Sequence, residues 1–161
     1  MSEEYEYSFK VKSIKEFIDY CKKNKYRKID EYKQVRTLYK NGGKIMARIT
    51  KNIYEDRTVE ILNFKDDNLN NNILSVSRES LDLHITKENK KFVKSLISIL
   101  ELNDEKVLKR HRVVYKKGHV KFEIDEYTVP KMKVVAIEGD KEQVDRVYKE
   151  LENVIIKNKL D

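Results

Sequence analysis

One segment near the start of the chain alternates strictly between two kinds of side chain. Over residues 4–11 the odd positions carry aromatic or aliphatic side chains, and the even positions carry charged or hydroxyl side chains. Because successive side chains of a β-strand point to opposite faces, this pattern predicts a strand with one apolar and one polar face. Two architectures accept such a strand. In the common one the polar face meets solvent; in the other, a closed barrel turns it toward a lumen and covers the apolar face with helices.

The size and composition of the chain favour one domain. A chain of 161 residues can bury a sizeable core without disulfides, and the single cysteine, Cys21, excludes an intramolecular disulfide. No apolar run approaches the length of a membrane span, so we expect a cytoplasmic protein without membrane association. The net charge of +7 is spread over 35 basic and 28 acidic residues. It fits an anionic partner or simply a well-solvated surface.

Periodicity along the rest of the chain predicts an α+β fold of about eight strands and three helices. Hairpin turns are expected at Asn41-Gly42-Gly43 and Lys117-Gly118, and a loop over 66–72. Ser13 with Glu16, Thr86, and Asp140 with Gln143 are predicted to begin the helices. The expected strands are 4–11, 33–40, 44–51, 58–65, 73–85, 106–116, 119–127 and 131–138, and the expected helices are 14–24, 86–100 and 140–155.

Charged side chains recur on the polar faces of these strands. Arg110 and Arg112 are two residues apart, so their guanidinium groups share one face of a strand. Arginine and lysine bind phosphate oxygens, and carboxylates at a similar depth can hold a divalent cation through hard oxygen ligands. The other charged positions of this kind are Glu4, Glu6, Arg48, Lys65, Arg78, Asp125 and Glu138.

The order of these motifs resembles one known family. The segment "EYEYSFK" is similar to the Glu-x-Glu-x-Lys strand of CYTH domains, the triphosphate tunnel metalloenzymes. In the same order, "MARIT", "LNFK", "RESLD", "RHR", "IDEY" and "VPKMKVVAIEGD" resemble later motifs of that family. The resemblance spans nearly the whole chain. It implies one tunnel domain over residues 1–161, an eight-stranded antiparallel barrel with a charged interior flanked by about three helices.

The resemblance also implies roles for particular residues. Glu6 and Glu138 would be catalytic, and Mg²⁺ or Mn²⁺ would be held by Glu4, Glu6, Asp125 and Glu138. The phosphates of the substrate would be bound by Lys10, Arg48, Lys65, Arg78, Arg110 and Arg112. The chain departs from the family pattern at Arg36, Ser8, Thr50, Ser80, Asp82 and Ala136. The loss of a carboxylate at Ala136 matters most, because the family uses that strand for metal binding and for activating water.

Several functions therefore stay open from the sequence. The leading hypothesis is metal-dependent hydrolysis of inorganic triphosphate or of a nucleoside or thiamine triphosphate. The lost carboxylates favour a second, a catalytically silent protein that binds a nucleotide or polyphosphate as a sensor. A class IV adenylyl cyclase and a basic nucleic-acid binder are further alternatives, although a nucleic-acid partner is expected only as an RNA 5'-triphosphate end. The sequence does not decide whether the chain forms a homodimer.

Overall fold

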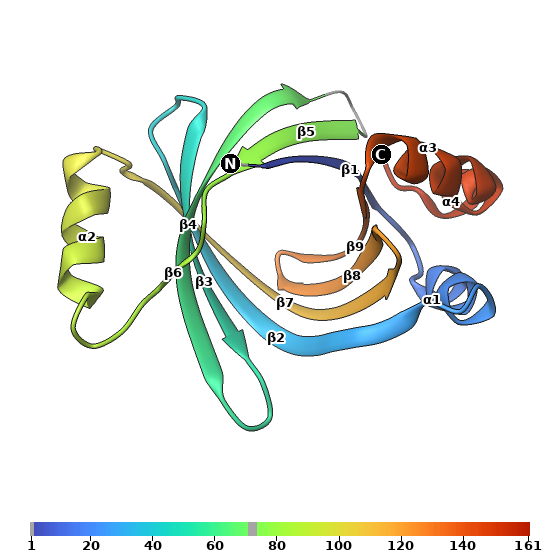
Figure 1. Ribbon diagram of the computed structural model, residues 1–161, viewed down its shortest axis with the longest axis horizontal. Coiled ribbons are helices and arrows are strands. Elements are labelled where there is room, and N and C mark those ends of the chain that lie inside the picture. The colour runs from blue at the N-terminus through green and yellow to red at the C-terminus, as the bar shows by residue number, and fades with distance from the viewer. Residues whose placement is uncertain (1, 71–73) are drawn as a thin grey trace.

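The computed structural model describes residues 2–70 and 74–161 of the chain (Figure 1). In these residues the helices are α1 (Lys15–Lys23), α2 (Lys90–Ile99), α3 (Lys141–Glu150) and α4 (Glu152–Asn158). The strands are β1 (Ser2–Lys10), β2 (Arg27–Lys40), β3 (Ile45–Ile53), β4 (Thr58–Asn70), β5 (Leu74–Glu79), β6 (Leu83–His84), β7 (Asp104–Lys117), β8 (Val120–Val129) and β9 (Lys131–Gly139).

Eight of the strands close into an antiparallel barrel. The order around the barrel is β3-β2-β7-β8-β9-β1-β5-β4, and pairing between β3 and β4 closes the ring. The short strand β6 adds to β4 outside the ring. In Figure 1 the eight strands surround a central opening, with α1, α3 and α4 on one side and α2 on the other. The predicted eight-stranded antiparallel barrel with flanking helices is confirmed, with one extra strand and four helices instead of about three.

The first strand has its apolar face outside, as the second architecture requires. Tyr7 donates a hydrogen bond to Asp145 of α3 at 2.6 Å and stacks on Tyr148 of that helix, with the ring centroids 4.3 Å apart. Phe9 is buried and its ring centroid lies 5.7 Å from that of Phe17 in α1. The polar positions of β1 consequently face the lumen.

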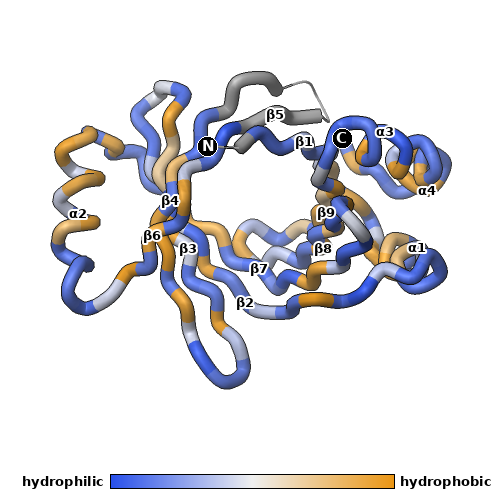
Figure 2. Tube along the Cα trace, in the orientation of Figure 1, coloured by the Kyte–Doolittle hydropathy of each residue, from blue (hydrophilic) through white to orange (hydrophobic). Residues whose placement is uncertain are grey.

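Two apolar clusters lie on the outer face of the barrel. The larger one joins the outward side chains of β1, β8 and β9 to α1, α3 and α4, and includes Phe17, Phe122 and Ile137 at 0% exposure. The smaller one seats α2 on β3 and β4 through Ala47, Leu62 and other buried residues. Figure 2 shows hydrophobic and hydrophilic residues alternating along the strands. The hydrophobic core is therefore the layer between barrel wall and helices, and the space inside the ring is left to polar groups.

Several local predictions were wrong. The Ser13–Glu16 capping box does not form: α1 begins after Ile14 without a side-chain cap, and Glu16 instead accepts a hydrogen bond from Lys157 at 3.1 Å. Thr86 accepts a hydrogen bond from the backbone N–H of Asn89 at 3.3 Å, so it orders the turn that precedes α2. By contrast, Asp140 begins α3 as predicted: it is the N-cap residue of that helix, although its side chain forms no cap hydrogen bond.

Other boundaries differ because tertiary pairing overrides local signals. Much of the loop expected at 66–72 belongs to β4, which continues to Asn70 because β5 pairs with it; residues 71–73 lie outside the described residues. The strand expected over 73–85 is divided into β5 and β6. The last helix is interrupted at Leu151, which is buried together with Ile155 of α4.

A search of the described helices found none with the length and apolar character needed to cross a membrane.

Candidate active site in the tunnel

The lumen of the barrel, which we call the tunnel, is a cavity of about 360 Å³ lined mostly by charged and amide side chains. Side chains reach it from every strand of the closed ring, including Glu79 at the end of β5. Its acidic lining residues are Glu4, Glu6, Glu79, Asp82, Glu123, Asp125 and Glu138. Its basic lining residues are Arg36, Arg48, Lys65, Arg110, Arg112 and Lys121.

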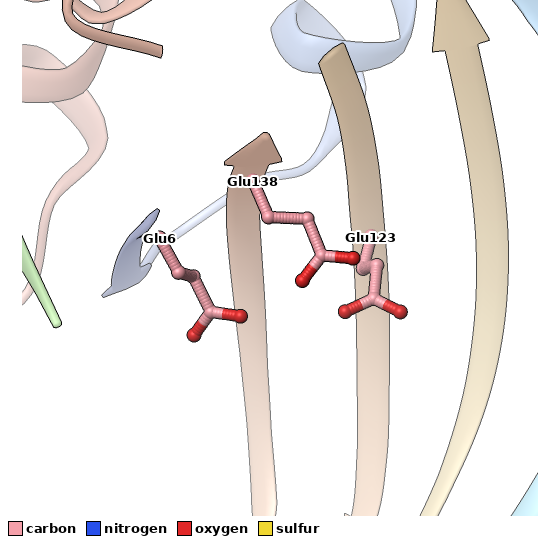
Figure 3. A group of neighbouring side chains, drawn as sticks. All are labelled: Glu6, Glu123 and Glu138. Atoms are coloured by element: carbon pink, nitrogen blue, oxygen red, sulfur yellow. The ribbon is translucent and has the colours of Figure 1, made fainter. Parts of the chain in front are cut away.

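Three carboxylates form a cluster on one side of the tunnel. Glu6 of β1 pairs in register with Glu138 of β9, and Glu123 of β8 pairs in register with Ala136. One carboxylate oxygen from each of the three glutamates lies within 4.8 Å of the others. Figure 3 shows these side chains reaching toward one another from three neighbouring strands. Three hard oxygen donors on a rigid wall fit Mg²⁺ or Mn²⁺.

The three carboxylates do not have equal proton affinities. Burial, together with the nearby Glu138 carboxylate, raises the pKa of Glu6 to about 8. Burial and the charge of Glu123 also raise the pKa of Glu138. The pKa of Glu123 is lowered, because Arg112 and Lys121 outweigh the effect of its burial. Without a metal, Glu6 therefore retains a proton near neutral pH, as expected when like charges are held close together.

Lys121 supplies an internal counter-charge to this cluster. Its ammonium nitrogen lies 2.5 Å from Oε1 of Glu138 and 4.0 Å from Oε2 of Glu123. Although burial opposes its charge, these two carboxylates raise the pKa of Lys121. A divalent cation in the cluster would share the same oxygens, so the amine would have to move aside or turn toward an anion.

A second group of side chains places guanidinium ions deeper in the tunnel. Asp125, 2% exposed, accepts hydrogen bonds from Arg112 Nε and Nη2, both at 2.8 Å, and from Arg110 Nη1 at 3.1 Å. Arg112 also donates to Glu123 at 2.7 Å. Asp125 thus orients two arginines and lies outside the cluster of three glutamates. Arg112 connects the two groups.

Arg36 and Arg110 retain capacity to bind an anion. Arg36 donates to the Thr50 hydroxyl at 3.0 Å, and no carboxylate of the described residues forms an ion pair with it. Burial and the charges of Arg110, Arg48 and Arg112 lower the pKa of Arg36 to about 9. The Nη2 of Arg110 is buried without a hydrogen-bond partner. A buried cation next to like charges is costly, and a polyanion would relieve that cost.

Two further basic lining residues lie on β3 and β4, across the ring from the three glutamates. Arg48 forms an ion pair with Glu79 at 2.9 Å and donates to Asn63 at 2.9 Å. Lys65 lies 3.9 Å from the same Glu79 carboxylate. These contacts fix the two cations so that they point into the tunnel.

Most residues selected from the sequence converge on the tunnel, and two do not. Those that line it are Glu4, Glu6, Arg48, Lys65, Arg110, Arg112, Asp125 and Glu138. Arg78 lies on the outer face, where it contacts Asp66 at 2.7 Å, because the register pairs Lys65 with Glu79 and so turns Glu79 inward. Lys10 is exposed and lines an adjoining cavity, described below, instead of the tunnel wall.

Sequence reasoning missed several tunnel residues. Glu123 and Lys121 were overlooked although they alternate with buried Phe122 and Ile124 of β8 in the same pattern that singled out Asp125. Glu79 was missed because the divided strand was expected to be continuous. Arg36 was noted only as a departure from the family. The departures Ser8, Thr50, Asp82 and Ala136 also line the tunnel, whereas Ser80 instead accepts a hydrogen bond from the backbone N–H of Phe64.

The closed eight-stranded antiparallel barrel with acids and bases turned inward is the architecture that the resemblance to CYTH proteins implied. A scan against protein-family models found no match, and a search of curated proteins found none.

Solved structures share this fold at low sequence identity. PH1012 from Pyrococcus horikoshii superposes with a TM-score of 0.71 at 16% identity, covering 94% of this chain and 87% of that one. HpAC1 from Hippeastrum, described as an adenylyl cyclase candidate with dominant triphosphatase activity, has a TM-score of 0.64 at 14% identity, covering 98% and 90%. The Mimivirus capping enzyme triphosphatase has a TM-score of 0.53 at 13% identity, covering 97% and 88%. At these identities the likeness shows the fold alone.

Proposed function

We propose that this protein binds the triphosphate group of its substrate in the tunnel and hydrolyses it with Mg²⁺ or Mn²⁺. One observation carries the proposal: a three-carboxylate cluster and a group of incompletely paired arginines face the same cavity, and Arg112 contacts both. Phosphoryl transfer depends on positioning and on stabilising charge, and this arrangement can supply both. The fold neighbours with triphosphatase activity support the same reading.

Each group of residues has a distinct role in this proposal. Arg36, Arg110 and Arg112 bind phosphate oxygens from β2 and β7, and Arg48 and Lys65 bind them from the adjoining strands β3 and β4. Glu6, Glu123 and Glu138 would hold the metal ion. When bound, the ion would neutralise phosphate charge and acidify water. The carboxylate of Glu6 or Glu138 would accept the proton of the attacking water.

Glu123 can replace the carboxylate that is missing at Ala136, the main departure from the family pattern. Ala136 lacks the carboxylate that the family places at this position, but its register partner on the next strand is Glu123. Paired residues of neighbouring strands have Cβ atoms about 5 Å apart, so the longer Glu123 side chain can put its carboxylate beside Glu6 and Glu138. The metal set is thereby restored from β8 in place of β9.

The test is phosphate release from inorganic triphosphate, ATP and thiamine triphosphate with Mg²⁺ or Mn²⁺. We expect turnover with at least one substrate, and a loss of about 100-fold or more in Glu123→Ala, a range typical of removing one preorganised charged group. Adding Ala136→Glu to that variant should recover part of the rate, because it returns a carboxylate to the same level of the wall. Absence of turnover with all three substrates would reject the hydrolase.

A second candidate is a tunnel that binds its ligand without hydrolysing it. The uncharged Ser8 and Ala136, which are register partners on the tunnel wall, favour it. This candidate predicts tight binding of inorganic triphosphate in calorimetry with no product formed. Gain of turnover in Ala136→Glu alone would support it, whereas turnover of the wild type would exclude it.

A further inference from the structure

The tunnel adjoins a different cavity at each end. One cavity, which we call the vestibule, has a volume of about 510 Å³ and shares Ser8, Tyr127 and Val134 with the tunnel. The other, of about 290 Å³, shares Glu4, Lys121 and Glu138 with it. On β1, β8 and β9 alike, the two sets of shared residues lie toward opposite ends of the strand. A ligand in the tunnel therefore meets two distinct surroundings.

The two end cavities differ in chemistry. Apart from its shared residues, the vestibule is lined by the apolar residues Phe9, Met132 and Leu160, by the two lysines Lys10 and Lys159, and by Asp161. The cavity at the other end adds only polar or charged side chains and a glycine, among them His119 and Asp140. An aromatic ring, a thioether and a leucine suit a flat heterocycle. The polar cavity offers such a group no apolar surface.

The vestibule has a wall fixed by backbone contacts. The N–H of Leu160 donates to the carbonyl of Lys10 at 2.9 Å, and Lys159 forms a bridge with Val11. The segment that carries Leu160 is thus tied to the end of β1. At the junction, Ser8 and Val134 line both cavities, and their side chains are small.

Tyr127 places the vestibule next to the phosphate-binding side chains. Its hydroxyl accepts a hydrogen bond from Arg110, whose guanidinium lies over the tyrosine ring, 5.2 Å from the centroid. The buried, unpartnered Nη2 belongs to this same arginine. Glu123 lies four residues along β8 from Tyr127, which corresponds to about 14 Å of strand. A chain of phosphates can lie between them.

We propose that the vestibule binds the nucleoside of an esterified polyphosphate substrate, with its first phosphate on Arg110 and its terminal phosphate toward the three glutamates. This inference rests on the proposed function, since it assumes that the tunnel holds the phosphates. It assigns the organic group to one end of the tunnel and predicts that a nucleoside triphosphate gains contacts that inorganic triphosphate lacks. The amines of Lys10 and Lys159 lie beside the nucleoside and its first phosphate.

The test compares ATP with inorganic triphosphate by calorimetry in EDTA, where metal-dependent hydrolysis does not interfere. Wild type is compared with Leu160→Ala and Met132→Ala, which remove apolar wall from partly exposed positions. Each truncation should raise the Kd for ATP about threefold to tenfold, the effect of losing about one or two methylene contacts. The Kd for inorganic triphosphate should change less than twofold.

His119→Ala, at the opposite end cavity, is the matched control and should leave the Kd of ATP unchanged. Two results would overturn the inference while leaving the proposed function in place: equal shifts for both ligands in the vestibule variants, or a selective loss of ATP binding in His119→Ala. Failure of wild type to bind or hydrolyse either ligand with Mg²⁺ or Mn²⁺ present would instead reject the proposed function. Circular dichroism of each variant confirms that it is folded.

Discussion

The two faces of strand β8 differ in chemistry: the outer face is apolar and the inner face is charged. Its outward residues Phe122 and Ile124 are 0% and 1% exposed and pack under the helices. Its inward residue Asp125 is 2% exposed, and together with the half-buried Glu123 it belongs to a network of charges. Burial by itself thus does not distinguish core from site. The outer face stabilises the fold, and the inner face holds charges ready for a ligand at a cost in stability.

Removing side-chain volume from the outer face of β8 should lower the free energy of unfolding more than any other change considered below. Phe122→Ala removes a ring that packs against Tyr20 and Tyr26, with centroids 5.8 and 5.2 Å away. We expect the free energy of unfolding to fall by about 3–5 kcal/mol, as for other buried phenylalanines. Chemical denaturation measures it. A loss below about 1 kcal/mol would contradict the assignment of this layer as the core.

Removing a charged partner from the inner face of the barrel should also lower the free energy of unfolding. Arg112→Leu leaves Glu123 without its guanidinium and Asp125 with only Arg110. Removing one member of a buried ion pair commonly costs about 3–5 kcal/mol, and the remaining partners should reduce this to roughly 2–3 kcal/mol. Denaturation measures the loss. Because the cost comes from unpaired carboxylates, adding Glu123→Gln should restore part of the stability; a further loss would contradict this explanation.

The crowded carboxylates should make stability depend on pH. In the metal-free folded protein the pKa of Glu6 is raised from its ordinary value of 4.5 to about 8. Unfolding therefore releases this proton between those two pH values, and the contribution of Glu6 falls as pH rises through that range. Glu6→Gln should be stabilised relative to wild type, increasingly so from pH 5 to pH 8. Thermal unfolding in EDTA measures the difference, and a difference independent of pH would refute the raised pKa.

The smallest effect is expected at Arg36. Its neighbours Arg48, Arg110 and Arg112 repel it and lower its pKa. Arg36→Gln should raise the free energy of unfolding of the ligand-free protein by up to about 1 kcal/mol. The same change should weaken triphosphate binding about tenfold, since a hydrogen bond to a charged group is lost. Denaturation and calorimetry measure the two effects, and loss of both stability and binding would contradict the expected trade-off.

Alternation predicts which side chains share a face, because each strand carries that signal locally, whereas the closed barrel was predicted from the family resemblance. Residues 4–11 show the alternation without any tertiary information, and it places Glu6 on the polar face of its strand. The same alternation places Arg112 on the polar face of a later strand, and both residues line the tunnel. Sequence analysis fails where the pairing of two strands decides which residues face the tunnel. Arg78 and Glu79 are adjacent and oppositely charged, and only their register with Asp66 and Lys65 decides which one faces inward.

The carboxylate cluster was only partly predictable for a related reason. Ala136 could be identified as the position of a missing glutamate. Its replacement, Glu123, lies on another strand, 13 residues earlier in the chain. Such compensation depends on the pairing of β8 with β9, which no local pattern contains. Glu123 itself was accessible from alternation along β8. Its position beside Glu6 was not.

The most direct measurement compares an arginine inside the tunnel with one outside it. Calorimetry should follow inorganic triphosphate binding to wild type, Arg110→Leu and Arg78→Leu, since Arg110 lines the tunnel and Arg78 contacts Asp66 on the outer face. We expect Arg110→Leu to weaken binding at least tenfold and Arg78→Leu to change it less than twofold. Equal losses in both variants, or no binding by the wild type, would contradict a polyphosphate site enclosed by the barrel.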